Sequence, residues 1–203
     1  MDPAVSLPAL VMCGGRGSRL RPAVGDTEKP LVEIGGRPMV DRVCAALRAS
    51  RVGDMYAAVS PQAPETAARL GETDVTVIET PGEGYVDDLT AALDVVGTPA
   101  VTVSADLPFL QAAHVDRAIA AAGGDSVAVC VPLSVAEEVG ASAETTVDHE
   151  GRPVVPTGLN VVGEGVDRRV VVETEPLAVN VNRPADLRLA ERIFRESYYS
   201  VSE

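Results

Sequence analysis

Short apolar runs alternate with longer amphipathic stretches through the first two thirds of the chain. The apolar runs have the length and composition of buried strands and lie at 9–13, 55–59, 74–79, 100–104 and 126–132. Between them, apolar residues recur at helical spacing, and this spacing predicts helices over 38–51, 65–70, 86–96 and 111–122. Such alternation is typical of βα units. We therefore expect an α/β protein with a mostly parallel, twisted sheet flanked by helices.

The pattern changes after residue 133, where the regular alternation stops. A hairpin is predicted over 144–155, with its turn at Glu150-Gly151. Further short strands are predicted over 158–162, 169–173 and 177–182, and Pro184 then opens a terminal helix. We therefore expect a single domain over residues 1–203, with a small β-rich insertion in its C-terminal third.

Glycines and cationic side chains are concentrated in the segment that follows the first predicted strand. Glycines let the backbone bend and bring its N–H groups close to an anion, and neighbouring cationic side chains neutralise phosphate charge. The spacing fits neither a Walker A loop nor the dinucleotide fingerprint. Lys29 is the only lysine among 17 basic residues, which indicates a position that needs a point charge on a flexible stem. The candidate phosphate-binding residues are Gly14, Gly15, Arg16, Gly17, Ser18, Arg19 and Lys29.

The formal charge of -13 excludes a general nucleic-acid binder, because such a protein would need a basic patch. The charge is unevenly spread along the chain. Residues 1–51 hold eight basic and five acidic side chains, whereas residues 52–203 hold nine and twenty-five. The glycine-rich loop lies in the basic part, so an anionic ligand there would have local electrostatic support. The acidic remainder, with lysine almost absent, suggests a cytoplasm of high salt.

Polar side chains follow or end two of the predicted strands. Asp106 comes just after the 100–104 strand, and a carboxylate in such a buried place is costly unless it is paired or binds a cation. We interpret Asp106 as a Mg²⁺ ligand, with a helix cap or a loop aspartate as the structural alternative. Asn180 and Asn182 would point to the same face of the last strand. There they either approach the metal or initiate a turn before Pro184.

A second glycine-containing connection precedes the predicted 86–96 helix. Gly82 and Gly84 can admit a flat base against the backbone, and Tyr85 follows them directly. In open α/β sheets ligands collect at the carboxyl ends of strands, so this connection should face the same crevice as the first loop. Asp87 and Asp88 are better explained as complements to the helix dipole than as catalysts.

The remaining reactive side chains have structural explanations. His114 and His149 lack partners at metal-ligand spacing, and we expect both to be surface or structural residues. Three cysteines, Cys13, Cys44 and Cys130, show no disulfide spacing, and their odd number favours a reducing compartment. Residues 1–8 lack the basic start and apolar run of a signal peptide, and no segment reaches transmembrane length. We therefore expect a cytoplasmic protein.

Taken together, these segments resemble the nucleotidyltransferase superfamily of the molybdenum-cofactor guanylyltransferase type. Residues 9–31 resemble its opening signature, Asp106 its metal aspartate, and 180–187 its closing Asn-x-Asn-x-Pro segment. Within that superfamily, the segments 82–89, 104–107 and 156–162 resemble the archaeal GTP:adenosylcobinamide-phosphate guanylyltransferases. The resemblance implies a Rossmann-like nucleotidyltransferase fold. Its nucleotide-binding half would span 1–132, and acceptor-side β segments with a closing helix would span 133–203.

The resemblance also implies the reaction, in which GMP passes from GTP to adenosylcobinamide phosphate in cobalamin biosynthesis and pyrophosphate leaves. No nucleophilic residue is needed, because the acceptor phosphate itself attacks. Lys29, Arg19 and Asp106 would be the catalytic residues, and Mg²⁺ would lie on Asp106 near Asn180 or Asn182. Gly82, Gly84 and Tyr85 would contribute to the guanosine pocket. The segment 156–160 is either a plain strand entry or the acceptor contact, through Thr157, Gly158 and Asn160.

The implied partners are the two small-molecule substrates, and no nucleic-acid partner is expected. The sequence does not decide whether the chain forms a homodimer. A longer segment over 21–27 departs from the molybdenum-type opening and has a length found in sugar-phosphate nucleotidyltransferases. Molybdopterin guanylyltransferase and sugar-1-phosphate nucleotidyltransferase therefore stay as alternatives. A GTP-binding regulatory subunit is the alternative that is not an enzyme.

Overall fold

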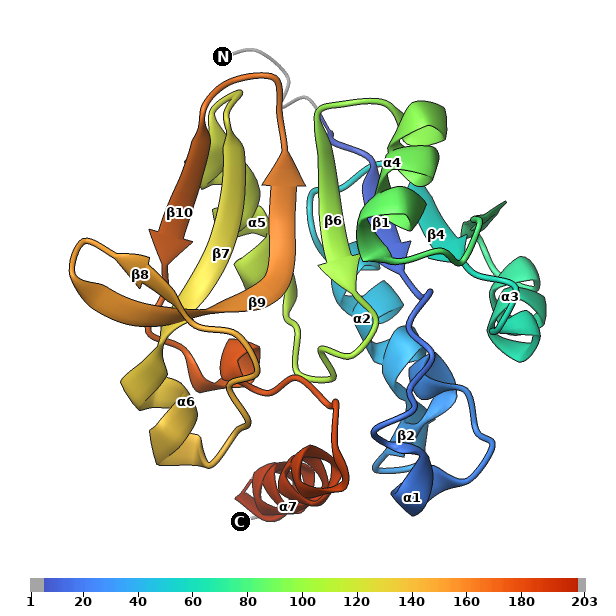
Figure 1. Cartoon of the computed structure of the whole chain (residues 1–203), viewed down its shortest axis with the longest axis vertical. Helices are drawn as coiled ribbons and strands as arrows, with labels where there is room; N and C mark the ends of the chain where they lie inside the picture. The colour runs from blue at the N-terminus through green and yellow to red at the C-terminus, as the bar shows by residue number, and fades with distance from the viewer. Residues whose placement is uncertain (1–5, 201–203) are drawn as a thin grey trace.

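The computed structural model describes residues 6–200, with side chains described for residues 6–197. Residues 1–5, which carry part of the signal-peptide expectation, lie outside that range. The described chain is built on an eight-stranded sheet with helices on its faces (Figure 1). A separate two-stranded ribbon is formed by β2 (Glu33–Ile34) and β3 (Arg37–Pro38). The predicted α/β class is therefore confirmed.

The large sheet has a parallel part and a mixed part. In the parallel part, β1 (Ala9–Met12) lies between β4 (Met55–Val59) and β6 (Ala100–Ser104), and β5 (Thr76–Glu79) pairs with β4 at the edge. In the mixed part, the long β9 (Arg152–Val162) is antiparallel to β6 and to β7 (Ser126–Pro132). β10 (Asp167–Val171) is parallel to β7, and β8 (Val147–His149) forms the predicted hairpin with β9. The strand order is β10-β7-β9-β6-β1-β4-β5.

Helices cover the two faces of this sheet unequally. On one face lie α2 (Met39–Arg48) and α5 (Ala112–Ala122), where Val43 and Val115 join Val11 of β1 in the main core. On the other face lies α4 (Tyr85–Val96), whose Ala92 packs in a smaller cluster with Leu10 of β1. In Figure 1, α4 lies in front of β1 and β4, and α5 lies behind β7 and β9. The side of the sheet that α4 covers is therefore open over β9, β7 and β10.

Shorter or peripheral elements complete the described chain. These are α1 (Arg21–Val24), α3 (Pro64–Gly71), α6 (Leu133–Val139), α7 (Pro184–Ser200) and 3-10 turns at Lys29–Leu31 and Glu175–Ala178. A second apolar cluster packs Leu20 and Ile34 against Val181 and Leu189 of the C-terminal segment. This cluster holds the end of the glycine-rich loop beside the asparagine segment, although they lie far apart in the sequence. None of the described helices has both the length and the apolar character that a membrane span requires.

Two sequence-based expectations need correction. The 177–182 segment is no strand, because a 3-10 turn ends at Ala178 and the following residues make only a single backbone bond, from the Val181 N–H to the Asp106 carbonyl. Its apolar residues are buried because it crosses between two core clusters, which imitates a strand pattern. The hairpin arm ending at 155 and the 158–162 strand are one continuous strand, β9. In addition, a 3-10 turn at Lys29–Leu31 precedes β2, and α6 occupies a stretch for which the sequence analysis gives no element.

Candidate active site

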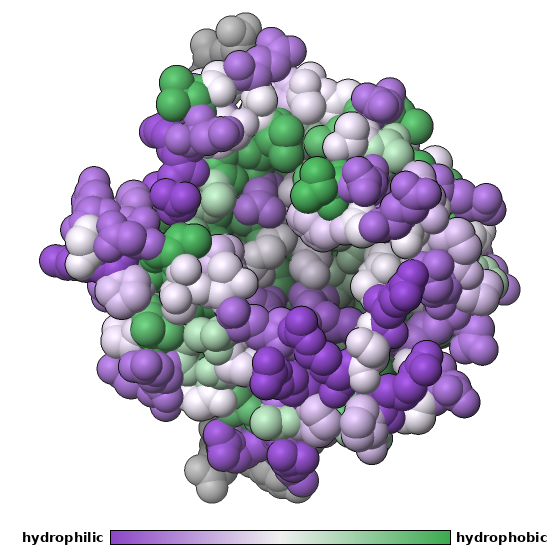
Figure 2. Space-filling view, in the orientation of Figure 1, coloured by the Kyte–Doolittle hydropathy of each residue, from purple (hydrophilic) through white to green (hydrophobic). Residues whose placement is uncertain are grey.

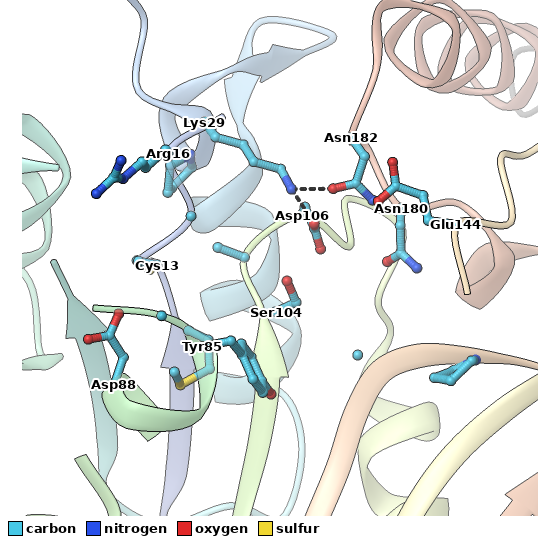
Figure 3. A pocket seen from close by; sticks show the side chains of 18 of the residues that line it. Cys13, Arg16, Lys29, Tyr85, Asp88, Ser104, Asp106, Glu144, Asn180 and Asn182 are labelled. Atoms are coloured by element: carbon cyan, nitrogen blue, oxygen red, sulfur yellow. Dashed lines mark hydrogen bonds and ion pairs between the residues drawn. The ribbon is translucent and has the colours of Figure 1, made fainter. Parts of the chain in front are cut away.

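A cleft of about 1000 Å³ opens at the carboxyl ends of β1 and β6 (Figures 2 and 3). Its walls come from three segments that the sequence singles out: the glycine-rich loop, the connection before α4 and the middle of β9. This is the edge of an open α/β sheet at which ligands bind. The structure therefore brings together most of the residues that the sequence predicts for one site.

Lys29, Asp106 and Asn182 meet at the centre of this cleft (Figure 3). The Lys29 ammonium donates to Asp106 Oδ2 at 2.5 Å and to Asn182 Oδ1 at 2.6 Å. The Lys29 and Asp106 side chains are only 14% and 10% exposed, so their attraction is weakly screened by solvent. An ammonium and a carboxylate with little water around them present charge of both signs to an incoming triphosphate and its counter-ion.

Glu28, the residue before Lys29, is tied to the start of α3. Its carboxylate accepts the backbone N–H groups of Glu65 at 2.8 Å and Thr66 at 2.7 Å, and also the Thr66 hydroxyl at 2.6 Å. The first N–H groups of a helix have no partner within the helix, and a carboxylate at that end also complements the helix dipole. Glu28 therefore fixes the backbone from which the Lys29 side chain extends.

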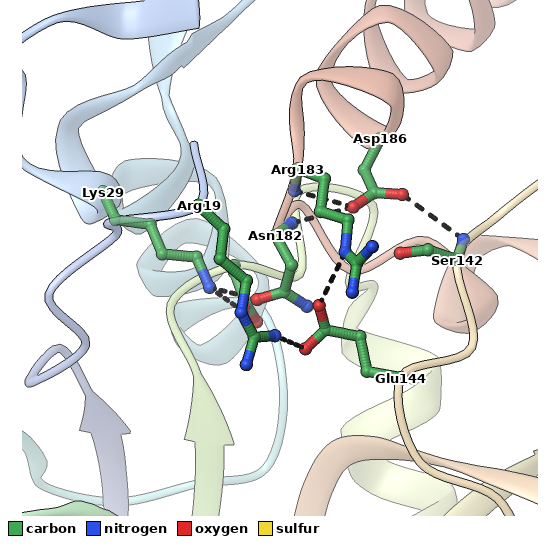
Figure 4. Close-up of polar contacts among 8 residues, drawn as sticks. Arg19, Lys29, Ser142, Glu144, Asn182, Arg183 and Asp186 are labelled. Atoms are coloured by element: carbon green, nitrogen blue, oxygen red, sulfur yellow. Dashed lines mark hydrogen bonds and ion pairs between the residues drawn. The ribbon is translucent and has the colours of Figure 1, made fainter. Parts of the chain in front are cut away.

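Asp186 fixes the other side of the contact in a similar way (Figure 4). It is 2% exposed, and its carboxylate accepts the backbone N–H groups of Asn182 at 3.1 Å, Arg183 at 2.8 Å and Ser142 at 3.3 Å. These bonds cap the start of α7 and hold the loop before Glu144 against it. Asn182 is thus positioned by a buried acid four residues later, and not by a strand.

The glycine-rich loop is packed tightly at Gly14 and open at Gly15. A Cβ added to Gly14 would come within 2.8 Å of Asp88 Oδ2, whereas one added to Gly15 would meet nothing within 4 Å. Gly17 has a φ of 60°, and a Cβ there would lie 3.0 Å from Lys29 Cβ. Gly14 and Gly17 therefore need to be glycine for packing, while the space beside Gly15 is available to a ligand.

Asp88 links the two glycine-containing segments. It is 3% exposed, lies in the first turn of α4, and accepts the Gly82 N–H at 2.7 Å. Its other oxygen approaches Gly14 of the first loop. The prediction that Asp88 only complements the helix dipole is therefore incomplete, because the side chain also fixes the distance between the two loops.

Arg19 lies at the rim of the cleft, where it pairs with Glu144 (Figure 4). Its side chain is 61% exposed, and Glu144 accepts a second bond from Arg183 Nε at 3.1 Å. The two guanidinium groups lower the pKa of Glu144, Arg19 having the larger effect. Of the predicted phosphate ligands, Gly14, Gly15, Arg16 and Lys29 line the cleft. Glu144 was missed because the chain around it shows no motif.

The predicted acceptor residues divide into two groups. Thr157 belongs to the cleft lining but is only 1% exposed, and its hydroxyl donates its single proton to the Val129 carbonyl at 2.9 Å and accepts the Leu159 N–H at 3.2 Å, so it cannot also donate to a ligand. Gly158 has a φ of 85° and approaches Ser104, a Cβ there being 3.1 Å from Ser104 Cβ. Asn160 lines the cleft with its side chain near Thr102 Oγ1, at 3.5 Å.

Oxygen ligands for a divalent cation are available beside Lys29. Among the described residues, no three histidine, cysteine or acidic side chains lie close enough together to hold a metal alone. Asn180 Oδ1, however, is buried in the cleft lining without a hydrogen-bond partner, and Asp106 lies in the same lining. One or two protein oxygens completed by substrate phosphates are the coordination that Mg²⁺ prefers. The residues present therefore fit a magnesium ion brought in with a nucleotide.

The other titratable side chains either have structural roles or line the cleft. Burial raises the pKa of the Cys13 thiol and raises that of Cys44 to about 11, as expected of core cysteines. His114 Nδ1 accepts the Gln111 N–H at 3.2 Å and so caps α5. Tyr85 is 53% exposed at the start of α4, and desolvation, followed by the charge of Asp106, raises its pKa. Its hydroxyl is therefore a neutral hydrogen-bonding group.

The fold and this site define a class of protein. A glycine-rich loop that leads to a lysine, facing an aspartate at the end of the neighbouring strand of a mostly parallel sheet, is the arrangement of nucleotidyltransferases. The chain belongs to the family of MobA-like NTP transferase domains, whose model matches residues 9–191.

Individual relatives agree with this assignment. Adenosylcobinamide-phosphate guanylyltransferase from Methanocaldococcus jannaschii is 30% identical over 203 aligned residues, covering 94% of this chain and 98% of that protein. Mannose-1-phosphate guanyltransferase from Schizosaccharomyces pombe is 31% identical over 131 residues, covering 58% of this chain and 36% of that protein. A solved structure, a putative glucose-1-phosphate thymidylyltransferase from Bacillus anthracis, has a TM-score of 0.68 at 15% identity, covering 94% and 96% of the two chains. The predicted resemblance is therefore confirmed, and the solved structure supports the fold.

Proposed function

We propose that this chain transfers GMP from GTP to the phosphate of adenosylcobinamide phosphate, giving adenosylcobinamide-GDP and pyrophosphate. The observation that carries nucleotidyl transfer is the meeting of Lys29 and Asp106 beside the glycine-rich loop. The choice of acceptor rests on the relative from M. jannaschii, whose similarity extends over nearly the whole of both chains.

The reaction requires the enzyme to position the substrates and neutralise their charge, and it does not require a covalent intermediate with an enzyme residue. An oxygen of the acceptor phosphate attacks the α-phosphorus of GTP, and the bond from that phosphorus to the oxygen bridging to the β-phosphorus breaks. The leaving pyrophosphate keeps the electron pair. The backbone around Gly14 and Gly15 would hold the β- and γ-phosphates, and the Lys29 ammonium would contact the α-phosphate as charge develops there.

Arg19 would have to exchange partners to take part. It now bonds Glu144 at the rim, so the predicted contact between Arg19 and the triphosphate needs the guanidinium to leave that carboxylate. Arg16 already lines the cleft and can neutralise the same phosphates without such an exchange. We therefore assign the nearer phosphate contact to Arg16 and propose Arg19 as a contact made after the exchange.

Mg²⁺ would be held by Asp106 and by Asn180, whose Oδ1 has no other partner. Asn182 Oδ1 would instead accept the hydrogen bond from the Lys29 ammonium. When bound, the ion would supply positive charge that offsets the charge of the phosphates and favours departure of pyrophosphate. Gly82, Gly84 and Tyr85 would border the guanosine. The open backbone at Gly84 and the neutral Tyr85 hydroxyl support this assignment.

A second candidate is a sugar-1-phosphate nucleotidyltransferase. The longer segment before Glu28 forms the short helix α1, and the S. pombe relative acts, by its name, on mannose 1-phosphate. Molybdopterin guanylyltransferase is a third acceptor assignment inside the same family. A regulatory subunit that only binds GTP would release no pyrophosphate with any acceptor.

The test is an assay of pyrophosphate release from purified protein with Mg²⁺ and GTP. Adenosylcobinamide phosphate, mannose 1-phosphate and molybdopterin are offered as separate acceptors, and ATP replaces GTP in a parallel series. Release that needs both GTP and adenosylcobinamide phosphate supports the proposal. Release with another acceptor only, or binding of GTP without release, rejects it.

We also propose that the enzyme works in a cytoplasm of high salt. Its support is the net charge of -13 with a single lysine, together with three free, buried cysteines. The assay is therefore repeated across a range of potassium chloride concentrations, with sedimentation of the same sample to test for the homodimer. Activity that is lost as salt is raised would oppose the salt assignment.

A further inference from the structure

One face of the sheet is left open next to the cleft. α4 covers this face over β1 and β4, and beyond β6 no helix of the described chain packs on the same side. Strand registers define a row across the open face: Thr102 of β6, Asn160 of β9, Ala128 of β7 and Arg169 of β10. Three strand spacings separate the ends of this row, about 14 Å. We call the part of this face over β9, β7 and β10 the open platform.

Side chains on the open platform are small over its middle and charged at its edge. Ala128 and Val162 are half-buried, and Ser126 lies in the neighbouring row. Asp167 and Arg169 stand on the outermost strand, β10, and are exposed. The space-filling view shows pale and green side chains over this region with purple ones along its left rim (Figure 2). Its middle is therefore flat and weakly polar.

The open platform is continuous with the cleft. A second hollow of about 380 Å³ lies over β7, β9 and β10, and Asn160 lines both this hollow and the cleft. A ligand that reaches Asn160 from Lys29 and Asp106 can thus continue onto the platform without crossing a ridge of backbone. This continuity distinguishes the platform from an isolated surface hollow.

Two sides of the cleft are bordered by the start of α4 and by a cluster of charged side chains. On one side the start of α4 stands over the sheet, with Tyr85 and the buried Asp88 beside the glycine-rich loop. On the opposite side Glu144 joins Arg19 and Arg183 across the rim. An acceptor whose phosphate lies at Lys29 has room to extend its bulk between these two sides, over Asn160.

We propose that the open platform binds the macrocycle of the acceptor, a flat ring fringed with neutral amide groups. The inference rests on the proposed function and deepens it by locating the acceptor. Ala128 and Val162 would contact the face of the ring, because only short side chains leave room for a broad planar group. Asn160 would exchange hydrogen bonds with the ring's amides, and Asp167 and Arg169 would meet the amides at its far side, whereas the Ser126 hydroxyl is already bonded to the Gly163 backbone.

The test enlarges one platform residue and measures each substrate separately. Ala128→Arg places a long side chain across the platform, while Ala120→Arg makes the same change on α5, behind the sheet, where Ala120 is exposed. For Ala128→Arg we expect the KM for adenosylcobinamide phosphate to rise by about tenfold or more. Its dissociation constant for GTP should stay within about twofold, because the nucleotide site is separate. Ala120→Arg should change neither constant.

A smaller substitution guards against misfolding. Ala128→Leu adds apolar volume at the same half-buried position and should raise the same KM by a smaller factor, with GTP affinity retained. An unchanged acceptor KM in both variants, in protein that binds GTP normally, overturns the platform assignment. Equal loss of GTP and acceptor binding in the Leu variant, with a normal thermal transition, overturns it too. If wild-type protein releases no pyrophosphate with this acceptor, the proposed function fails first, which is a different result.

Discussion

The Lys29 ammonium lies 2.5 Å from the carboxylate of Asp106, although 77 positions separate the two residues in the chain. Lys29 comes from the loop after β1 and Asp106 from the end of the adjacent, parallel β6. Before substrate binds, each charge neutralises the other, and the two side chains are only 14% and 10% exposed. A nucleotide with its metal can replace both halves of this pair, since the phosphates attract the ammonium and the cation attracts the carboxylate. The charges of Lys29 and Asp106 therefore cancel each other without substrate, and each is matched by an opposite charge of the substrate complex once the nucleotide and its metal are bound.

Removing the Lys29 ammonium should abolish most of the turnover. For Lys29→Ala we expect kcat to fall by about 10²–10³-fold, because a single preorganised group facing developing charge contributes that much. Pyrophosphate release under saturating GTP measures the change. Lys29→Arg should restore only part of the rate, because a planar fork cannot occupy the same point between Asp106 and Asn182.

Arg21→Ala is the matched control for charge in this region. Arg21 is exposed, lies on α1 in the same loop and lies outside the cleft lining. Its removal lowers the local positive charge by the same amount and should leave kcat nearly unchanged. Turnover of Lys29→Ala close to that of Arg21→Ala, in folded protein, would remove Lys29 from the mechanism.

Asp106→Asn should weaken magnesium dependence as well as activity. The amide keeps the size of the carboxylate but loses the charge that attracts the cation and balances Lys29. We expect a large fall in kcat and a rise in the Mg²⁺ concentration needed for half-maximal rate. Titrating Mg²⁺ after chelation of the purified protein measures both. A normal magnesium curve for this variant would show that Asp106 is no ligand.

Motifs and the expectation of parallel strands were sufficient to place the main parts of this site at one edge of the sheet. The run ending at Cys13 and the run ending at Ser104 read as buried parallel strands, and parallel strands place their carboxyl ends at one edge of a sheet. That rule places the glycine-rich loop and Asp106 at one edge, whereas the direct bond between Lys29 and Asp106 also depends on the adjacency of β1 and β6, which the sequence did not predict. Gly158 and Asn160 were found through the resemblance, although they lie inside a longer strand than the pattern suggested.

The contacts that hold the site residues in place could not be predicted from the sequence in the same way. Glu144 reaches Arg19 across 125 positions, and Glu28 reaches the start of α3 across 38. Such pairs depend on where loops end in space, and isolated carboxylates carry no pattern that identifies their partners. The 177–182 segment failed for another reason, because a chain that crosses between two cores has the apolar composition of a strand without its hydrogen bonds.

Glu28 should position Lys29 without touching substrate. Glu28→Gln replaces one acceptor oxygen by a donor that faces backbone N–H groups of α3, which should cost about 1–3 kcal/mol of unfolding free energy. We also expect kcat to fall more than GTP affinity, because the lysine loses its fixed origin. Urea unfolding and a separate GTP titration measure the two effects. Glu65→Gln serves as control, since only the Glu65 backbone takes part in the bond. A loss of stability in Glu28→Gln with unaltered kcat would limit Glu28 to a structural role.

Two adjacent glycines should respond oppositely to the same substitution. Gly14→Ala puts a Cβ within 2.8 Å of the buried Asp88 carboxylate and should lower thermal stability by moving the two loops apart. Gly15→Ala meets open space, so its stability should be retained while GTP affinity falls, because the methyl group occupies the approach of a phosphate. Thermal melting and GTP titration of both variants distinguish the effects. If Gly15→Ala binds GTP normally, the phosphates do not approach the backbone there.

The Glu144 contact at the rim should show a definite pH dependence. Arg19, and to a lesser degree Arg183, lower the pKa of Glu144 in the folded chain, so the unfolded carboxyl binds protons more readily. The stabilisation is therefore complete above the unfolded value, about 4.3, and is lost as pH falls through the lower folded value. Because Arg19 is largely exposed, Glu144→Gln should cost less than about 1 kcal/mol at neutral pH. Urea midpoints of wild type and Glu144→Gln should converge in acid, whereas the control Glu138→Gln, at an exposed position on α6, should match wild type throughout. A difference that persists unchanged from neutral pH into acid would mean that Glu144 acts through packing and not through its charge.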